Sequence, residues 1–192
     1  MLLLLVTLSC LAAVKTQVEP CCMETQWSAT RYDVHVYDDG TDVAADFYYD
    51  FTKRSTATQY YQTGSRVKAN RVVTSDVKNA QYDIYPDGRC IKNIQKEFVL
   101  PNCIPKNSMH LGTSYVGEEA SWLKSDTWVY TSGSANVTVG VTNPECILIF
   151  QGIVKKYHVR YMIEVLDKQV YFNGYEKGIT DPTVFDVPLS CQ

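Results

Sequence analysis

Histidine is scarce in this chain, and no two cysteines are paired in the way that metal sites use. Only three of the 192 residues are histidine (His35, His110 and His158), and none of the seven cysteines forms a C-x-x-C pair. Structural zinc sites usually combine such a pair with further cysteines or closely spaced histidines. The sequence therefore gives no basis for a zinc site.

The chain also lacks an excess of positive charge and a second long apolar run. Lys and Arg number 18 against 21 Asp and Glu, a net charge of −3. Proteins that bind nucleic acids or anionic membranes usually carry a basic patch, so neither partner is expected. After the first stretch, no segment is apolar for long enough to form a transmembrane helix.

Motifs of catalysis are missing as well. The sequence has no P-loop, no dinucleotide-binding fingerprint and no H-E-x-x-H motif. The stretch from Gly112 to Gly117 has the spacing G-x-S-x-x-G rather than that of a nucleophile elbow, and no strand-to-helix pattern surrounds it. We therefore predict that the protein is not an enzyme and has no catalytic residues.

The first residues have the character of a secretory signal. Met1 to Ala13 form an apolar run too short to span a bilayer, followed by small residues that suit a signal peptidase, although the run has no basic residue before it. We predict that residues 1–16 are a cleaved signal peptide, that residues 17–192 form one domain, and that the protein is secreted.

Cleavage would remove Cys10 and leave an even number of cysteines in an oxidising compartment, which predicts three disulfides. Six cysteines allow 15 pairings, and their spacing does not choose among them. The six are Cys21, Cys22, Cys90, Cys103, Cys146 and Cys191.

Alternation of apolar and polar residues predicts an all-β, antiparallel fold. Residues 43–51 place Phe47 and Tyr49 on one face and Tyr48 on the other, and the 14 tyrosines suit half-buried strands. Further strands follow at the short, regular spacing of a sandwich or barrel. They are expected at 27–37, 55–63, 66–75, 81–85, 90–99, 122–130, 136–141, 146–154 and 157–166, with a turn at Asp167-Lys168 before a return over 170–172.

Two segments do not fit the strand pattern. Leu100 to Tyr115 has no usable period and is predicted to be a long loop held by Cys103, and at most one short helical turn is expected, around 117–124. In the tail, Pro182 and Pro188 exclude a central strand, while Val184 and Phe185 are apolar enough to dock on a core. With Cys191 as a staple, the tail is predicted to be a strap across the fold.

Two kinds of surface site are indicated. Asp38, Asp39 and Asp42, with Asp46 nearby, form an acidic cluster that offers oxygen ligands to a hard cation such as Ca²⁺, without the spacing of an EF-hand. Asn136-Val137-Thr138 is an acceptor sequence for N-glycosylation and predicts a surface position for Asn136.

These landmarks resemble the ependymin-related family of secreted glycoproteins. Residues 178–191 resemble the family's closing G-I-x-D-P-S-V-F-x-P-P-x-x-C, although Pro188 is followed by Leu189 instead of a second proline. Trp27 stands six residues after Cys21, Cys146 opens an apolar strand without the family's following proline, and the stretch from Gly88 to Cys103 is longer than usual.

The resemblance implies two stacked, curved antiparallel sheets that form a half-open barrel with a deep hydrophobic pocket, similar to bacterial lipoprotein carriers. It implies a secreted, non-enzymatic binder of a lipid or other hydrophobic ligand, a homodimer, and Ca²⁺ binding. The alternative is a structural extracellular-matrix component, for instance of a calcified matrix, or an adhesion or signalling protein. The strand residues expected to line the pocket are Phe47, Tyr49, Val139, Phe150, Tyr161 and Ile163.

The resemblance also implies a disulfide pairing. Cys21 would bond to Cys146 and Cys103 to Cys191, which leaves Cys22 for Cys90. Joining Cys103 to Cys191 would close a long loop, which the chain-entropy model values at about 4 to 5 kcal/mol. A local bond between Cys90 and Cys103 is the open alternative.

Overall fold

The protein is built almost entirely of β-strands in the computed structural model, which describes residues 18–34, 43–62, 64–94, 99–117, 122–159 and 162–191. Only the backbone is described for Val43, Val116, 155–159 and 162–167. Two short 3₁₀ helices, η1 (Pro182–Phe185) and η2 (Leu189–Cys191), lie in the tail. The strands are β1 (Gln26–Val34), β2 (Val43–Asp50), β3 (Ser55–Tyr61), β4 (Lys68–Ser75), β5 (Ala80–Ile84), β6 (Cys90–Ile94), β7 (Met109–Val116), β8 (Leu123–Ser132), β9 (Ala135–Thr142), β10 (Leu148–Val159) and β11 (Met162–Lys177).

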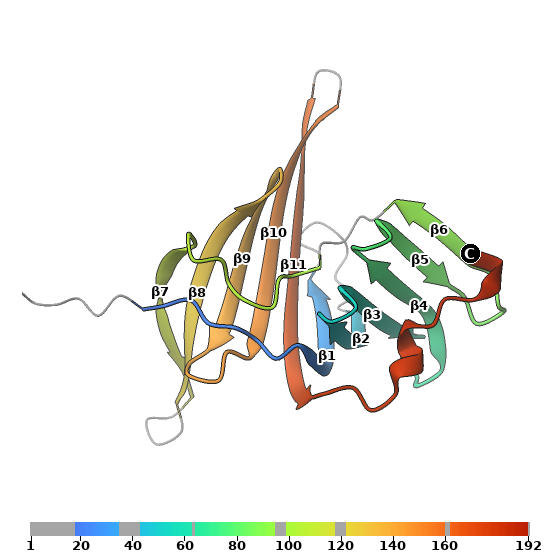
Figure 1. The fold of residues 1–192 in the computed structure, drawn as a ribbon, viewed down its shortest axis with the longest axis horizontal. Helices are drawn as coiled ribbons and strands as arrows, with labels where there is room; N and C mark the ends of the chain where they lie inside the picture. Colours follow the sequence, from blue (N-terminus) through green and yellow to red (C-terminus); the bar gives the residue numbers. More distant parts are fainter. Residues whose placement is uncertain are drawn as a thin grey trace, which may run out of the picture.

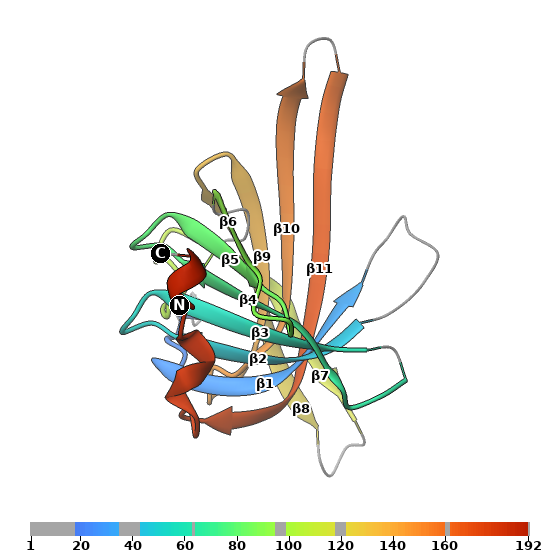
Figure 2. The ribbon, with the colours of Figure 1, turned by 90° about the vertical axis from the view of Figure 1, so that its right-hand side faces the viewer.

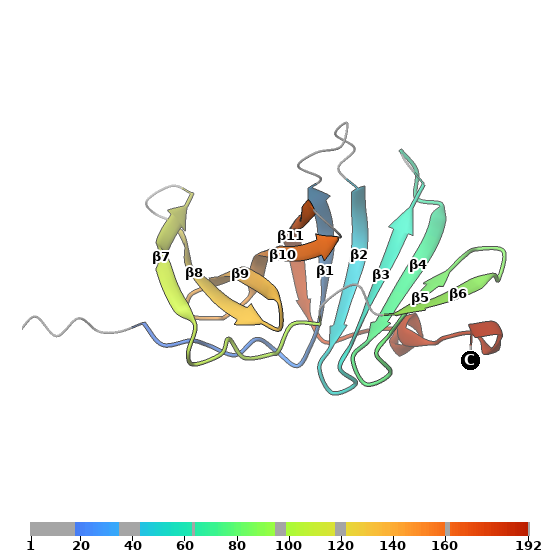
Figure 3. The ribbon, with the colours of Figure 1, turned by 90° about the horizontal axis from the view of Figure 1, so that it is seen from above.

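The all-β prediction is confirmed, but the strands form one sheet instead of two stacked ones. They lie in the order β6-β5-β4-β3-β2-β1-β11-β10-β9-β8-β7, and every neighbouring pair is antiparallel. The first and last strands join the two halves, because β1 pairs with β11 from Trp27↔Lys177 to Val34↔Gln169. The sheet stays open, and Figure 3 shows how strongly it bends between β7 and β6.

The strand order explains the longest connection in the chain. Strands β1 to β6 run outward from the centre of the sheet to one edge, and β7 to β11 run back from the opposite edge. The chain between β6 and β7 must therefore pass from edge to edge. Residues 99–108 do so across one face of the sheet, beside residues 18–25 at the start of the described chain (Figures 1 and 3).

The two faces of the sheet carry separate apolar clusters. We call the face with Trp27, Phe47 and Tyr49 the inner face, and the crossing segments 18–25 and 99–108 pack against it. The outer face carries Tyr48 and, on β3 to β5, a second cluster against which the tail packs. Both faces of a single sheet are thus used to bury apolar side chains.

The tail is a strap, as the sequence predicts, and it crosses the outer face of β3 to β6 (Figure 2). Val184, Phe185 and Val187 are half-buried against the outer cluster. Arg71 of β4 holds the strap by donating to the main-chain oxygen of Asp186 over 2.8 Å and of Thr183 over 3.4 Å.

Two local predictions are wrong, and a third falls partly outside the described residues. Residues 109–116 of the predicted loop form edge strand β7, where pairing with β8 supplies the order that the sequence pattern lacks. The predicted turn at Asp167-Lys168 lies inside β11, where these residues pair with Val154 and Ile153. The region expected to hold a helical turn is partly outside the described residues, and β8 begins within it at Leu123.

Candidate ligand-binding site

The candidate site is the apolar part of the inner face, formed by β1, β2 and β8 to β11. Trp27 lies at its centre and is 1 % exposed. Its ring centroid is 5.3 Å from Phe47, 5.4 Å from Tyr49 and 5.7 Å from Phe172. Offset and edge-on rings at such distances attract one another beyond simple burial. The side chains therefore form one aromatic floor, and Val137, Val139 and Val141 of β9 extend it.

The crossing segments cover this floor. Met23 from the first segment and Val99, Leu100 and Ile104 from the second are buried in the same cluster as the strand side chains. The phenol of Tyr49 donates to the main-chain oxygen of Leu100 over 2.9 Å. The inner face is thus packed against short pieces of irregular chain instead of against a second sheet.

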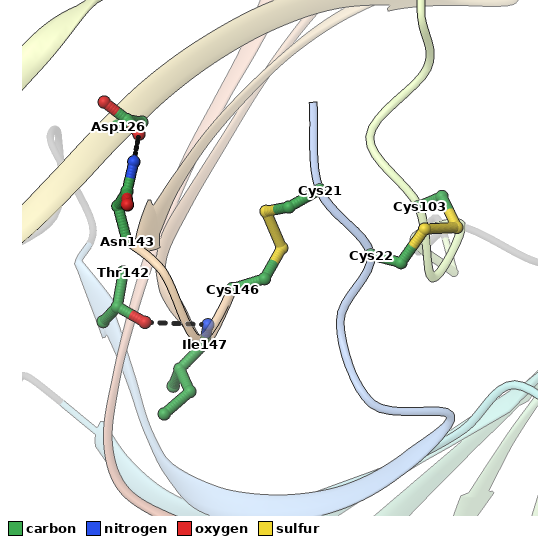
Figure 4. Close-up of a disulfide and its surroundings, with 8 residues drawn as sticks. All are labelled: Cys21, Cys22, Cys103, Asp126, Thr142, Asn143, Cys146 and Ile147. Carbon is green, nitrogen blue, oxygen red and sulfur yellow. Dashed lines mark hydrogen bonds between the residues drawn. A yellow bond between two sulfur atoms is a disulfide. The ribbon is translucent and has the colours of Figure 1, made fainter. Parts of the chain in front are cut away.

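The crossing segments are also tied to each other. The amide of Met23 donates to the oxygen of Asn102 over 2.6 Å, and the amide of Ile104 donates to the oxygen of Cys21 over 3.0 Å. A disulfide joins Cys22 to Cys103, and Figure 4 shows it beside the bond between Cys21 and Cys146. The two segments therefore form one cover, which Cys146 anchors at the β9–β10 turn.

The predicted disulfides are right in one pair and wrong in two. Cys21 bonds to Cys146, as the resemblance implies. Cys22 bonds to Cys103 instead of Cys90, and Cys191 bonds to Cys90 instead of Cys103. The local bond between Cys90 and Cys103 is absent too. The reason is topological, because Cys103 lies on the inner face whereas the strap and Cys191 lie on the outer face beside β6.

The six predicted pocket residues fall into three groups. Phe47, Tyr49 and Val139 all lie in the inner cluster. Phe150 lies on the outer face, because it pairs with Gly140, whose neighbours Val139 and Val141 point inward, and a β-bulge after Leu148 shifts its register. Tyr161 is outside the described residues, and only the backbone of Ile163 is described, so neither placement is tested.

The acidic cluster cannot be placed as a site. Asp38, Asp39 and Asp42 lie outside the described residues. Asp46 is half-buried on β2 and accepts a hydrogen bond from the phenol of Tyr61. Burial and, to a smaller extent, the hydrogen bond to this carboxylate raise the pKa of Tyr61 to about 12. In the described part of the chain, no three His, Cys, Asp or Glu residues come together in a way that could hold a metal ion.

Asn136 is exposed on β9, on the face opposite to Val137, and accepts a hydrogen bond from Thr131 over 3.2 Å. This position leaves room for a glycan, and occupancy stays a prediction. It lies on a strand paired on both sides, by β8 and β10, so it is not at an edge of the sheet.

Sequence reasoning missed a buried ion pair. Arg31 and Asp33 are 3 % and 4 % exposed, and their side chains meet at 2.8 Å. The Asp33 carboxylate also lies 3.7 Å from the amine of Lys168. The alternation of β1 could have indicated this pair, because Arg31 and Asp33 lie on the same face of the strand as Trp27 and Ala29. The sequence alone favours the opposite face, with Tyr32 and Val34, as the buried one.

A second carboxylate is held firmly on the inner face near edge strand β7. Asp126 of β8 accepts hydrogen bonds from Thr113 over 2.5 Å, Asn143 over 2.5 Å and His110 over 3.2 Å. Burial opposes ionisation, but these three donors outweigh it and lower the pKa of Asp126. The carboxylate joins β7, β8 and the β9–β10 turn, where Figure 4 shows its contact with Asn143.

Among the described residues, no helix has the length and apolar character needed to cross a membrane.

Comparison with known proteins identifies a family. Residues 68–191, more than half of the chain, match the family model described as Ependymin. No curated protein matches the sequence.

Two solved structures resemble the fold at low sequence identity. An uncharacterised conserved protein from Thermus thermophilus has 13 % identity, a TM-score of 0.49, and coverage of 88 % of this chain and 89 % of its own. A LolA superfamily protein from Nitrosomonas europaea has 6 % identity, a TM-score of 0.39, and coverage of 86 % and 90 %.

Proposed function

Because the chain belongs to the ependymin family, we propose that it is a secreted, non-enzymatic protein that binds a lipid or another hydrophobic ligand on the apolar part of its inner face. One observation carries the proposal. The aromatic floor around Trp27 is covered by two short crossing segments that insert Met23, Val99, Leu100 and Ile104. An aliphatic chain has the same chemistry as these side chains and could take their place on the floor.

The crossing segments offer a route by which such an exchange could occur. In the described chain they form no ladder of their own with the strands, and two main-chain hydrogen bonds and the Cys22–Cys103 disulfide tie them to each other. They are held to the sheet by the Tyr49–Leu100 contact, by the amide of Phe51 donating to the oxygen of Thr25, by the Lys177–Glu24 ion pair and by the Cys21–Cys146 disulfide. Local opening of irregular segments usually costs less than opening of a paired sheet. The sheet can therefore stay intact while the cover moves.

Ligand binding can be tested with the secreted protein and a fluorescent fatty acid, cis-parinaric acid. Native mass spectrometry first shows whether a lipid co-purifies. Leu100→Ala then shortens an apolar side chain of the cover, and we expect it to change the affinity for cis-parinaric acid several-fold. Val184→Ala is the control, because it shortens an apolar side chain of the strap on the outer face and should leave the affinity unchanged.

Near-ultraviolet circular dichroism should confirm that both variants keep their packing. The proposal fails if the wild-type protein carries no lipid and does not bind cis-parinaric acid. It also fails if both variants alter the affinity alike, since the site would then not be on the inner face.

Homodimerisation is part of the same proposal. Edge strand β7 exposes Met109, Leu111 and Tyr115, and Trp122 and Leu123 are exposed beside it. An apolar edge with unpaired backbone groups favours pairing with a second copy. We expect light scattering to show a dimer at tens of micromolar protein and Leu111→Lys to shift it to a monomer. A monomeric wild-type protein would contradict this.

Calcium binding is proposed from the family resemblance and the acidic residues Asp38, Asp39 and Asp42. Titration calorimetry with Ca²⁺ should give heat that the triple substitution to Asn removes. No heat and no rise in melting temperature at millimolar Ca²⁺ would rule it out. The structural role in a calcified matrix depends on this binding and would be ruled out with it.

A further inference from the structure

The inner face changes from apolar to polar between β2 and β3. Phe47 and Tyr49 of β2 pair directly with Thr58 and Thr56 of β3. These threonines are 2 % and 7 % exposed. A buried face that was purely structural would be expected to continue with apolar side chains. The polar side chains therefore need another explanation.

Most apolar side chains of β3 to β5 point the other way, although Val72 of β4 pairs with Thr58 and Asp83 on the inner face. Ala57, Val73 and Tyr82 pair in one row across these strands and pack toward the strap on the outer face. The alternation of each strand then places its polar residues on the inner face. The sheet thus reverses which of its two faces is apolar, and the inner face becomes apolar in one part and polar in the next.

The polar side chains form a continuous row. Tyr49, Thr56, Thr74, Gln81 and Asn93 are successive cross-strand partners from β2 to β6. Neighbouring strands are about 4.8 Å apart, so each side chain in the row is a direct cross-strand neighbour of the next. Thr74, near the middle of the row, is 1 % exposed. The row starts at the aromatic floor and leads away from it.

Two buried atoms in this row lack a hydrogen-bond partner among the described residues, the hydroxyl oxygen of Thr74 and the side-chain oxygen of Gln81. A buried polar atom without a partner costs free energy, and valine would fill the place of Thr74 without that cost. Such atoms in a protein call for an explanation, and a bound molecule is one.

Neighbouring residues fix which way Gln81 points. Its side-chain nitrogen donates to Asp83 over 3.0 Å, and the other oxygen of Asp83 accepts from Asn93 over 2.8 Å. Because the Asp83 carboxylate can only accept hydrogen bonds, the nitrogen of the Gln81 amide must face it, and not the oxygen. The oxygen of Gln81 is therefore left as an acceptor on the residue that pairs with Thr74, whose hydroxyl can donate or accept.

The charges around the row are balanced. Arg31 donates to Thr58 over 3.3 Å and is paired with Asp33, which also lies near Lys168. Together with Asp83 of β5, these residues of β1 and β11 give two cations and two carboxylates among the described side chains near the row. Among the described side chains, an ionic head group would find no excess of either charge, whereas a hydroxyl group would find hydrogen-bonding partners.

We infer that Thr56, Thr74 and Gln81 bind the uncharged, hydroxyl-bearing head group of an amphipathic lipid, of the monoacylglycerol type, whose acyl chain lies on the aromatic floor. The inference rests on the proposed hydrophobic site and adds the chemical class of its ligand. The oxygen of Gln81 accepts a hydrogen bond from a head-group hydroxyl, and Thr74 contacts the same head group. The change from apolar to polar between β2 and β3 then matches the junction between the acyl chain and the head group of the lipid.

The test compares two lipids that have the same acyl chain and differ in the head group. Displacement of cis-parinaric acid from the full secreted chain gives affinities for 1-monooleoylglycerol and for oleate. We expect Thr74→Val to weaken binding of 1-monooleoylglycerol by about three- to tenfold, as for the loss of one hydrogen bond, and to leave oleate within about twofold. Thr127→Val, on the outer face of β8, is the matched control and should change neither affinity.

The outcomes separate this inference from the proposed function. If neither cis-parinaric acid nor either lipid binds the wild-type protein, both ideas fail. If the fatty acids bind but Thr74→Val weakens both lipids equally or neither, the hydrophobic site stands and the head-group site is wrong. A lower melting temperature for Thr74→Val than for Thr127→Val would also overturn it, since the hydroxyl would then have a structural hydrogen bond.

Discussion

Tyr49 on β2 donates a hydrogen bond of 2.9 Å to the main-chain oxygen of Leu100, 51 positions further along the chain. This bond joins the aromatic floor to the segment that covers it. Burial, the largest cause, raises the pKa of Tyr49, so the phenol keeps its proton over the whole physiological range. The contact is therefore present whenever the cover is in place.

Removing that phenol should loosen the cover. We expect Tyr49→Phe to lower the free energy of unfolding by about 1 to 3 kcal/mol, because the buried oxygen of Leu100 loses its side-chain donor. Tyr130→Phe is the control, since Tyr130 is also buried on the inner face but donates no side-chain hydrogen bond in the described structure. Urea unfolding measures both, and equal losses would contradict the role of the Leu100 contact.

The disulfide pairing predicts the fragments of a non-reduced digest. Trypsin should release Cys90 and Cys191 as a separate pair of linked peptides, because Lys92 and Lys96 allow cleavage between Cys90 and Cys103. The peptide with Cys21 and Cys22 should carry those of Cys103 and Cys146. A linked pair of Cys103 and Cys191 would instead support the pairing implied by family resemblance.

Phe150 should be coupled to Gly140 across the β9–β10 pair. A methyl group on Gly140 would lie 2.1 Å from the Phe150 ring, so Gly140→Ala should destabilise the protein by about 1 to 3 kcal/mol. Phe150→Leu frees that space. A double-mutant cycle followed by thermal unfolding should therefore show that Gly140→Ala destabilises the Phe150→Leu protein less than it destabilises the wild-type protein. Additive effects would mean that the ring does not cover this glycine.

Asp126 should make the protein sensitive to acid. Its hydrogen bonds lower its pKa in the folded state below the ordinary value of 3.8. A lowered folded pKa gives stability that is present above the unfolded pKa and is lost as the pH falls through the folded one. Urea unfolding should show this loss of stability below about pH 4. The Asp126→Asn variant should be less stable than the wild type at pH 7, and its free energy of unfolding should change less with pH below about pH 4. If the variant loses stability with falling pH as steeply as the wild type, another group causes the acid sensitivity.

Asn136 should carry a glycan when the chain passes through a secretory pathway. The side chain is exposed on the outer face of β9, so the enzyme PNGase F should lower the mass of the secreted protein. Asn136→Gln should remove that mass difference and change the melting temperature little, because exposed substitutions usually cost less than about 0.5 kcal/mol. An identical mass before and after treatment would show that the site is empty.

Local sequence pattern predicts much of the strand structure. Residues 43–51 alternate clearly, and β2 buries Phe47 and Tyr49 as that pattern indicates. The prolines and apolar pair of the tail likewise predict a docked strap. These features depend on neighbouring residues only, which is why they can be read without the fold.

The sequence does not indicate which residues the β-hairpin at 148–177 uses for its turn. The polar pair at 167–168 has the residue types of a turn. Both residues are nevertheless part of strand β11, because the pairing of β11 with β10 continues through them. The gain from continued pairing with a neighbour outweighs a weak local turn preference. A β-bulge after Leu148, equally invisible in the pattern, moves Phe150 from the inner to the outer face.

The sequence by itself determined the antiparallel strands, the six cysteines that could form three disulfides, and which residues of a strand share a face. Tertiary structure decided which face each strand buries and which cysteines meet. Both depend on the course of the chain around one open sheet: the crossing segments cover the apolar inner face and bring Cys103 to Cys22, while the strap covers the outer face of β3 to β6 and brings Cys191 to Cys90. Alternation has a period of two and is the same whichever side is covered, so only long-range contacts can choose the side.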